Sequence, residues 1–498
     1  MNVNPITRLD YPDPDVIRVE DTYYMVSTTM HFMPGCEILQ SFDLVHWEHV
    51  TYVYETLDHT DAQQLKSGQN IYGQGMWAAS LRYHEGRFCI CFVANDTRKT
   101  YLYTSEKIDG PWKKQLIEGF YHDGSLLFDE DGRNYIVYGN DEIWITELNE
   151  DLTAPKKDGL HRLLVSDHKN PELGYEGSHI QKINGYYYIF LVHSLRDRWM
   201  RTEACFYSDS LEGEFTGGDV LCDDRGYCGQ GVAQGGIVDT PDGKWYAMLF
   251  QDSGAVGRIP ILLPVTWKDH FPFFGQNGHV PEEIEVHSTR PGYIYQPLVG
   301  SDDFCNGLLP RWQFNHDPDP RYYHLDALQG TYTITTREVC TELTQAVNTL
   351  TQRMSYPSCA AEVTVDASAL KEGDVAGLCA LQGCYAAVGI TKHHGKYEVL
   401  MLDKKEDGIL DMTEGTVVES HQMDFRLEAD FCNMKDEARC YYRVNKGDWL
   451  PIGNVHKLYF KLDHFTGCRF GLFCYAAEET GGSACFRDFK YYDVDEIS

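Results

Sequence analysis

The sequence predicts an all-β protein with a five-bladed β-propeller in residues 1–295 and an antiparallel β-sandwich in residues 300–498. Three observations predict this architecture. Short apolar runs closed by turn residues dominate the chain, which contains 33 Tyr and 23 Phe, residue types that favour strands. One hairpin pattern recurs along the first half. From Ser301 onward the predicted strands are longer and alternate apolar and polar residues.

The recurring pattern is a tight acidic or amide turn, usually with glycine, followed by an aromatic-rich strand, which is typical of a β-hairpin. It occurs at Glu20–Val26, Glu85–Cys91, Asp131–Val137, Asn184–Phe190 and Asp242–Met248. The second turn residues of successive hairpins are 65, 46, 53 and 58 positions apart. A loose period of ~50 residues indicates four-stranded propeller blades, and the alternative is a set of unrelated hairpins in a sandwich.

The inner strand of each blade is predicted to begin at an equivalent position, eight or nine residues before the second turn residue. These positions hold Asp13, Trp77, Asp123, Glu176 and Gln234. Because the innermost strands of a propeller line its central channel, the five side chains are expected to converge around one axis. Three carboxyl groups around one cavity are costly unless they perform chemistry or bind a cation.

Glycosidic bond cleavage requires two carboxyl groups: one acid protonates the leaving oxygen, and one carboxylate activates water or attacks the sugar. A third carboxylate can keep the acid protonated near neutral pH by raising its pKa. Taken singly, Asp13 and Asp123 could be turn formers, since aspartate favours Asx turns. Glu176 is a poorer turn residue. The joint placement of the three in the repeat favours a catalytic site.

The propeller half resembles glycoside hydrolase family 43 in several motifs. These are Asn4–Ile6 with Tyr11–Pro14, Pro34–Gly35 with Ser41–Trp47, Asp123–Ser125, Tyr175–His179 and Gly257–Trp267. By this resemblance Asp13 would be the general base, Glu176 the general acid, and Asp123 the modulator of the pKa and orientation of the acid. Members of the family invert the anomeric configuration, which requires a carboxyl separation of ~6.5–9.5 Å to admit a water molecule.

The same resemblance implies further contacts with the sugar. Arg258 would reach the sugar in the first subsite, and Phe32 would form an apolar wall of the pocket. Trp77 could stack on a sugar face. The alternatives are a surface ion pair for Arg258 and core positions for Phe32 and Trp77.

The chain also departs from the family pattern. Trp77-Ala-Ala-Ser80 stands where Trp-Ala-Pro-Asp is usual, and Gly124 and Ser178 replace common prolines. The fifth blade often contributes a histidine that helps to hold a hydrated cation, often calcium, whereas this chain has Gln234. An amide oxygen orients waters around Ca²⁺ less specifically. We expect that the chemistry requires no cofactor. Whether a structural calcium ion binds on the propeller axis is left open by the sequence.

The second half predicts a sandwich because its strands alternate with period two and no long helical run interrupts them. It resembles the concanavalin-like sandwich of β-xylosidase-type members of the family. Trp312 with Asn315–Pro318, Asn348–Arg353 and Phe465–Gly467 carry that likeness. In those members a sandwich loop closes one side of the pocket, which favours the trimming of single terminal sugars. Phe465 would then be a wall of the pocket, and the alternative is a core residue at a strand end.

Charge and composition exclude several classes of protein. The formal net charge is −32, which repels the phosphates of nucleic acids. No apolar run approaches the ~20 residues that span a bilayer, and the first residues show no apolar secretory segment. Sixteen scattered cysteines without zinc-type spacing indicate free thiols in the cytoplasm. The expected partner is a small carbohydrate. Whether the chain forms a homo-oligomer is left open by the sequence.

The function expected from these features is an exo-acting inverting glycosidase that removes terminal or side-chain pentoses from hemicellulose oligosaccharides. An α-L-arabinofuranosidase acting on arabinoxylan fragments is preferred, because Gly73–Ser80 and Gly231–Gly236 look like that branch of the family. The first alternative is a β-D-xylosidase acting on xylo-oligosaccharides. The others are a non-catalytic sugar-binding propeller, a retaining fructan-active enzyme with carboxyl groups ~5–5.5 Å apart, and a structural protein.

Overall fold

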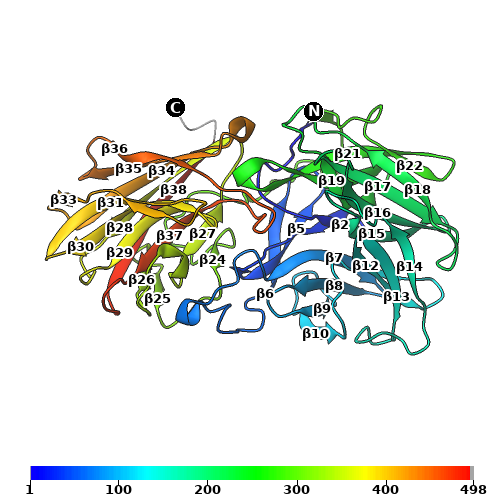
Figure 1. Cartoon of the computed structure of the whole chain (residues 1–498), viewed down its shortest axis with the longest axis horizontal. Helices are drawn as coiled ribbons and strands as arrows, with labels where there is room; N and C mark the ends of the chain where they lie inside the picture. Colours follow the sequence, from blue (N-terminus) through cyan, green and yellow to red (C-terminus); the bar gives the residue numbers. More distant parts are fainter. Residues whose placement is uncertain (1, 494–498) are drawn as a thin grey trace.

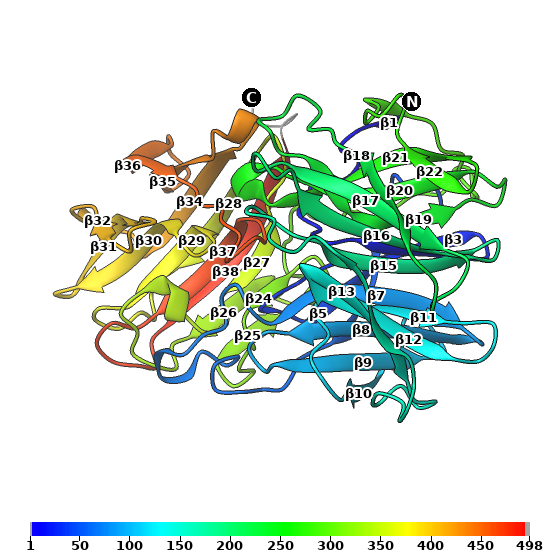
Figure 2. The ribbon, with the colours of Figure 1, turned by 45° about the vertical axis from the view of Figure 1, so that its right-hand side comes forward.

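The computed structural model describes residues 2–493 and confirms the all-β prediction, with a five-bladed propeller joined to a β-sandwich (Figure 1). Each blade is a four-stranded antiparallel sheet whose first strand lies nearest the axis. In Figure 2 the strands of the second blade follow one another outward from the centre of the propeller. No helix among the described residues has the length and apolarity needed to cross a bilayer.

The strands of the five blades are, in chain order, the following. The first blade contains β2 (Asp15–Val19), β3 (Thr22–Val26), β5 (Gly35–Ser41) and β6 (Glu48–Tyr54). The second contains β7 (Met76–His84), β8 (Arg87–Ala94), β9 (Lys99–Ser105) and β10 (Lys113–Ile117), and the third β11 (Ser125–Phe128), β12 (Asn134–Asn140), β13 (Glu142–Leu148) and β14 (His161–Ser166). The fourth contains β15 (Glu176–Ile183), β16 (Tyr186–Ser194), β17 (Arg201–Ser208) and β18 (Thr216–Leu221), and the fifth β19 (Val232–Asp239), β20 (Trp245–Asp252), β21 (Arg258–Lys268) and β22 (Phe271–Phe274).

The inner strands begin with irregular backbone at the predicted ring positions. The pairing register shifts between Met76 and Ala79, between Glu176 and His179, and between Ala233 and Gly236. A β-bulge of this kind re-aims a side chain without ending the strand. Asp13, Asp123 and Gln234 adopt left-handed backbone conformations, with φ of 52°, 48° and 63°. Such strained residues cluster at functional sites.

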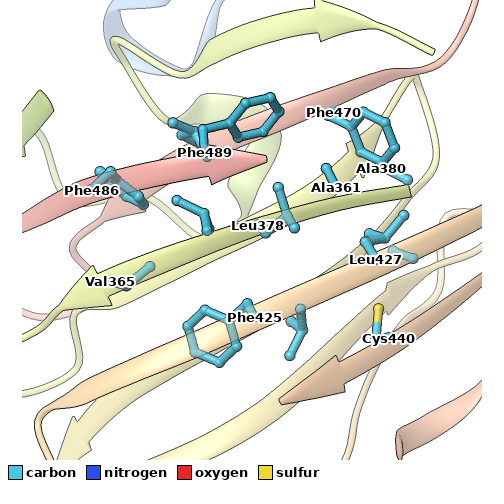
Figure 3. Packing of buried hydrophobic residues seen from close by; sticks show 14 of the residues in the cluster. Ala361, Val365, Leu378, Ala380, Phe425, Leu427, Cys440, Phe470, Phe486 and Phe489 are labelled. Atoms are coloured by element: carbon cyan, nitrogen blue, oxygen red, sulfur yellow. The ribbon is translucent and has the colours of Figure 1, made fainter. Parts of the chain in front are cut away.

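The sandwich packs a nine-stranded sheet against a seven-stranded sheet. The first contains β4 (Phe32–Met33), β24 (Gln313–Asn315), β27 (Leu350–Arg353), β29 (Val375–Leu381), β30 (Tyr385–His393), β31 (Lys396–Lys404), β32 (Leu410–Met412), β33 (Thr416–Val418) and β37 (Arg469–Tyr475). The second contains β25 (Tyr323–Asp326), β26 (Thr331–Thr335), β28 (Ser358–Asp366), β34 (Gln422–Asp430), β35 (Glu437–Val444), β36 (Leu450–Lys457) and β38 (Ser483–Asp493). Figure 3 shows Leu378 and Phe470 of the first sheet packed against Phe425 and Phe486 of the second, all fully buried.

Short elements complete the chain. Strand β1 (Asn2–Val3) pairs with β23 (Glu283–Ile284), and there are 3₁₀ turns η1 (Lys66–Gly68), η2 (Gly254–Val256), η3 (Leu343–Gln345) and η4 (Cys432–Met434).

The two halves share a sheet at their junction. Strand β4 lies between β3 and β5 of the first blade in the chain, yet it pairs with β24 of the sandwich. Beside it, Arg353 of β27 forms a buried ion pair with Glu37 of β5, with Nη1 2.8 Å from Oε2. The Glu37 carboxylate also lies 3.0 Å from Nδ1 of His49. Burial alone would raise the pKa of Glu37, but Arg353 and His49 outweigh it and hold the pKa below its usual value.

We predict that Glu37→Gln destabilises the whole chain. The amide leaves the Arg353 guanidinium buried without its counter-charge, which costs about 3–5 kcal/mol in buried pairs. Thermal and denaturant-induced unfolding would measure the loss. Asp131→Asn is the matched control, because Asp131 pairs with Arg133 at the surface and exposed pairs contribute less than about 1 kcal/mol. Equal midpoints for the two variants would contradict the prediction.

Candidate active site

The ring residues predicted from the repeat meet in one cavity of about 250 Å³ at the propeller axis. Asp13, Trp77, Asp123, Glu176 and Gln234 all line it. Arg258 and Phe465 line it as well, so seven of the eight predicted site residues come together. A larger cavity of about 550 Å³ is lined only by sandwich residues 403–407 and 455–459 and lies apart from this convergence.

Asp13 is held in one orientation by two donors. Nη1 of Arg258 donates to Oδ1 at 2.7 Å, and the hydroxyl of Thr28 donates to Oδ2 at 2.6 Å. The Asp13 side chain is 3% exposed. Both carboxylate oxygens therefore have defined directions, as a group that must receive a proton from a positioned water requires.

Two arginines are fixed by one buried aspartate. Asp252 accepts a hydrogen bond from Nε of Arg258 at 3.1 Å and another from Nε of Arg201 at 3.0 Å. Burial would raise the pKa of Asp252, but the two guanidinium groups outweigh it and lower the pKa. With its Nε engaged, Arg258 directs Nη1 to Asp13, whereas the buried Nη1 of Arg201 has no hydrogen-bond partner in the described part of the chain. Both arginines line the cavity.

Glu176 and Asp123 share a histidine. Nε2 of His122 lies 3.5 Å from Oδ2 of Asp123 and 3.6 Å from Oε2 of Glu176. Asn140 donates to Oε2 of Glu176 at 2.8 Å, and the backbone N–H of Gly177 donates to Oδ2 of Asp123 at 3.0 Å. The last bond couples the Asp123 carboxylate to the backbone next to Glu176.

The three groups titrate together. Burial opposes a charge on His122, but Asp123 and Glu176 outweigh it and raise its pKa to about 9. Burial, with Glu176 and Asp13, raises the pKa of Asp123 to about 6 against the effect of His122. Burial would also raise the pKa of Glu176, but His122 and two arginines outweigh it and lower the pKa. At neutral pH His122 therefore holds the first proton, and the next proton enters the Asp123–Glu176 pair near pH 6.

The sandwich supplies one wall of the cavity. Phe465 and Leu462 come from the segment between β36 and β37. The Phe465 ring lies under the guanidinium of Arg258, with 3.8 Å from Cζ to the ring centroid, and its edge meets Trp77 at 5.6 Å between centroids. Trp77 also makes an edge contact with His122. The pocket is thus built by both halves of the chain.

Phe32 lies outside the residues that line the cavity. It belongs to β4 at the junction of the two halves, is 3% exposed, and stacks under the guanidinium of Arg469 at 3.4 Å. The resemblance placed it in the sugar pocket, whereas the structure places it at the junction, paired with β24 and in contact with Arg469. The apolar wall next to Arg258 is Phe465 instead.

Seven lining residues were not predicted from the sequence: Ala78, His122, Asn140, Leu173, Trp199, Arg201 and Leu462. Ala78 and His122 are chain neighbours of Trp77 and Asp123, so the repeat could have suggested them. Arg201 begins the third strand of its blade, and the repeat pattern carried no signal for that position.

One group of side chains in the described part of the chain has three His, Cys, Asp or Glu ligand atoms within 4.8 Å of one another: His122, Asp123 and Glu176. A metal ion bound there would have to displace the proton that Asp123 and Glu176 favour on the His122 ring. The donor set fits proton transfer better than a resident metal.

The fold and the carboxylate-lined pocket define a protein of the glycoside hydrolase class. The signature of Glycosyl hydrolases family 43 matches residues 3–272, and that of the Beta xylosidase C-terminal Concanavalin A-like domain matches residues 301–492. The chain belongs to glycoside hydrolase family 43.

Relatives of the chain carry two kinds of name. A "Beta-xylosidase" of Formosa agariphila is 26% identical, with 99% of this chain and 89% of the relative covered. A "Non-reducing end alpha-L-arabinofuranosidase BoGH43B" of Bacteroides ovatus is 25% identical, with 66% and 63% covered.

The structure is also similar to solved ones. A "Bifunctional GH43-CE" chain of Bacteroides eggerthii is 42% identical with a TM-score of 0.92, and this chain spans 64% of its length.

We predict that Asp123→Asn stabilises the protein at pH 8 and does so less at pH 4.5. The folded-state pKa of Asp123 is raised to about 6, so its contribution is complete below the unfolded value of 3.8 and is lost as pH rises through 6. The neutral amide avoids that loss. Melting temperatures of both proteins at the two pH values would test this. A variant less stable than wild type at pH 8 would contradict the prediction.

Proposed function

We propose that the protein is an exo-acting, inverting glycosidase that removes single pentoses from hemicellulose oligosaccharides. The observation that carries the proposal is the convergence of Asp13, Asp123 and Glu176 in one cavity closed by the sandwich. A non-catalytic sugar-binding propeller would have no use for three carboxyl groups in one cavity, one of them paired with Arg258.

In this mechanism Asp13 is the general base. It takes a proton from a water molecule as the water oxygen attacks the anomeric carbon, while Glu176 gives its proton to the leaving oxygen and the glycosidic bond breaks. The hydrogen bonds from Arg258 and Thr28 fix the direction in which Asp13 accepts that proton. His122 and Asn140 lie at the oxygen of Glu176 that becomes charged, so they stabilise the product of its proton transfer.

Asp123 acts through its neighbours. Its carboxylate holds the N–H of Gly177 and thereby the backbone beside the acid. A side chain at Gly177 would place Cβ 2.7 Å from Cγ of Gln234, and the backbone there has a φ of +66°, so glycine is needed for this close approach. Because Asp123 and Glu176 share the proton that enters near pH 6, activity is expected to fall as pH rises above that value.

The closed wall formed by Leu462 and Phe465 supports exo action. An extended polysaccharide needs a cleft open at both ends, whereas here the sandwich occupies one side of the ring. The remaining cavity of about 250 Å³ suits one sugar ring held by Arg258 and Arg201 and faced by Trp77. Paired guanidinium groups recognise neighbouring hydroxyls of such a ring.

For the sugar we propose α-L-arabinofuranose in arabinoxylan fragments, with β-D-xylose as the alternative. The motifs Gly73–Ser80 and Gly231–Gly236 support the arabinose choice. Xylosidase names are commoner among the relatives and support the alternative, and two relatives carry both sugars in one name. We further propose a reducing compartment such as the cytoplasm, because all sixteen cysteines are free thiols and most are buried.

The first prediction concerns the substrate. Hydrolysis of p-nitrophenyl α-L-arabinofuranoside and of the β-D-xylopyranoside should be compared side by side, with Asp13→Asn as control. We expect the arabinoside to be turned over faster and the variant to lose at least about 10³-fold in kcat on both, because the base is always required. Faster xyloside turnover would support the alternative sugar, and no turnover of either would overturn the proposal of a pentosidase.

The second prediction separates the acid from the base. Glu176→Gln should retain far more activity on aryl glycosides with acidic leaving groups than on natural oligosaccharides, because a good leaving group needs little protonation. Asp13→Asn should lose activity on both substrates alike. Ratios of kcat/KM on the two substrates give the measurement. The same ratio in both variants would mean that the roles are wrongly assigned.

A further inference from the structure

Below the catalytic ring, the propeller axis is filled by one guanidinium group. Arg82 of β7 donates from all three of its nitrogens, and its side chain is 13% exposed. Nε donates to the Leu126 carbonyl at 2.9 Å, Nη1 to Oδ2 of Asp15 at 2.8 Å and to the Leu81 carbonyl at 2.6 Å, and Nη2 to the Ser125 hydroxyl at 2.7 Å and to the Ile180 carbonyl at 3.2 Å.

These contacts tie together the inner strands of four blades. Asp15 belongs to the first blade, Arg82 to the second, Ser125 and Leu126 to the third, and Ile180 to the fourth.

The fifth blade reaches the same cluster through Gly236. A Cβ at this glycine would lie 3.2 Å from Nδ1 of His179 and 3.5 Å from Oδ1 of Asp15. These two atoms are themselves 3.1 Å apart. The fifth blade therefore lies beside Asp15, the carboxylate with which Arg82 pairs.

The partners of Arg82 are all oxygens: one carboxylate, one hydroxyl and three carbonyls. Hard cations such as Ca²⁺ prefer this kind of donor set. Here the guanidinium occupies the positions that a cation would need, and two positive charges a few ångströms apart repel strongly in a buried site. The residues on this axis do not fit a resident calcium ion.

We propose that the guanidinium of Arg82 takes the place of an axial metal ion in this protein, so that a covalently attached cation holds the five blades in register. Arg82 is a positioning residue for the site. Asp15 and Ser125 are the first residues of β2 and β11, and Asp13 and Asp123 stand two residues before them, so a shift of the cluster would move both carboxylates. The inference does not rest on the proposed function, since it concerns charge balance and blade packing.

Thermal unfolding and metal analysis test the inference without substrate. For the wild type we expect well below one calcium ion per purified chain, and a melting temperature that a chelator leaves unchanged. Arg82→Met removes the charge and leaves the Asp15 carboxylate with His179 and the backbone N–H of Leu81. It should lower the melting temperature by roughly 5–10 °C. Arg133→Met is the matched control, because Arg133 pairs with Asp131 at the surface.

For the wild type, a melting temperature that depends on the chelator, or one bound calcium per chain, would overturn the inference. An Arg82→Met protein as stable as the wild type would also overturn it. If Arg82→Met cannot be purified, Arg82→Lys keeps the charge but loses the forked donors. A lysine variant that melts below the wild type and ignores the chelator supports the inference. A lysine variant whose stability depends on added calcium opposes it.

Discussion

Buried negative charge at the propeller axis is the constraint on which the rest of the structure depends. Asp13, Asp15 and Asp252 are each at most 3% exposed. Every one of them contacts an arginine: Arg258 for Asp13, Arg82 for Asp15, and both Arg201 and Arg258 for Asp252. An unpaired buried carboxylate costs several kcal/mol, so the arginines are needed for the inner strands to come together at all. Two of these arginines, Arg201 and Arg258, also line the cavity and are available to a ligand there.

The sandwich also supplies a hydrogen-bond donor to a buried carboxylate of the propeller. Asp10, which is fully buried, accepts hydrogen bonds from the backbone N–H groups of Arg258 and Gly467, so one carboxylate joins the fifth blade to the sandwich loop. A Cβ at Gly467 would lie 2.0 Å from the Val256 carbonyl, which shows how closely the loop approaches the propeller. This contact places Phe465 beneath Arg258. Removal of the sandwich would therefore open the pocket and also leave the buried Asp10 carboxylate with the N–H of Arg258 but without that of Gly467.

The group formed by His122, Asp123 and Glu176 shows a conflict between stability and chemistry. A protein optimised only for stability would not keep Asp123 ionised beside Glu176 in a buried site. The charge on His122 reduces the cost and makes the proton on Glu176 easier to release. In the proposed mechanism, the proton shared by these two carboxyl groups would be the one that the acid donates, and it would be present below neutral pH.

Much of the fold and of the site follows from local sequence patterns. The period-two strands and the five turns predict the blades, and counting back from each turn finds Asp13, Asp123 and Glu176, because a residue that begins an inner strand must face the axis. The sequence by itself determined these positions. Only the tertiary structure decided which side chains meet across blades. Arg201, Asp252 and Arg82 act through partners on other strands. Phe465 lines the pocket and Phe32 does not, because domain docking, which no local periodicity encodes, sets which aromatic ring faces the pocket.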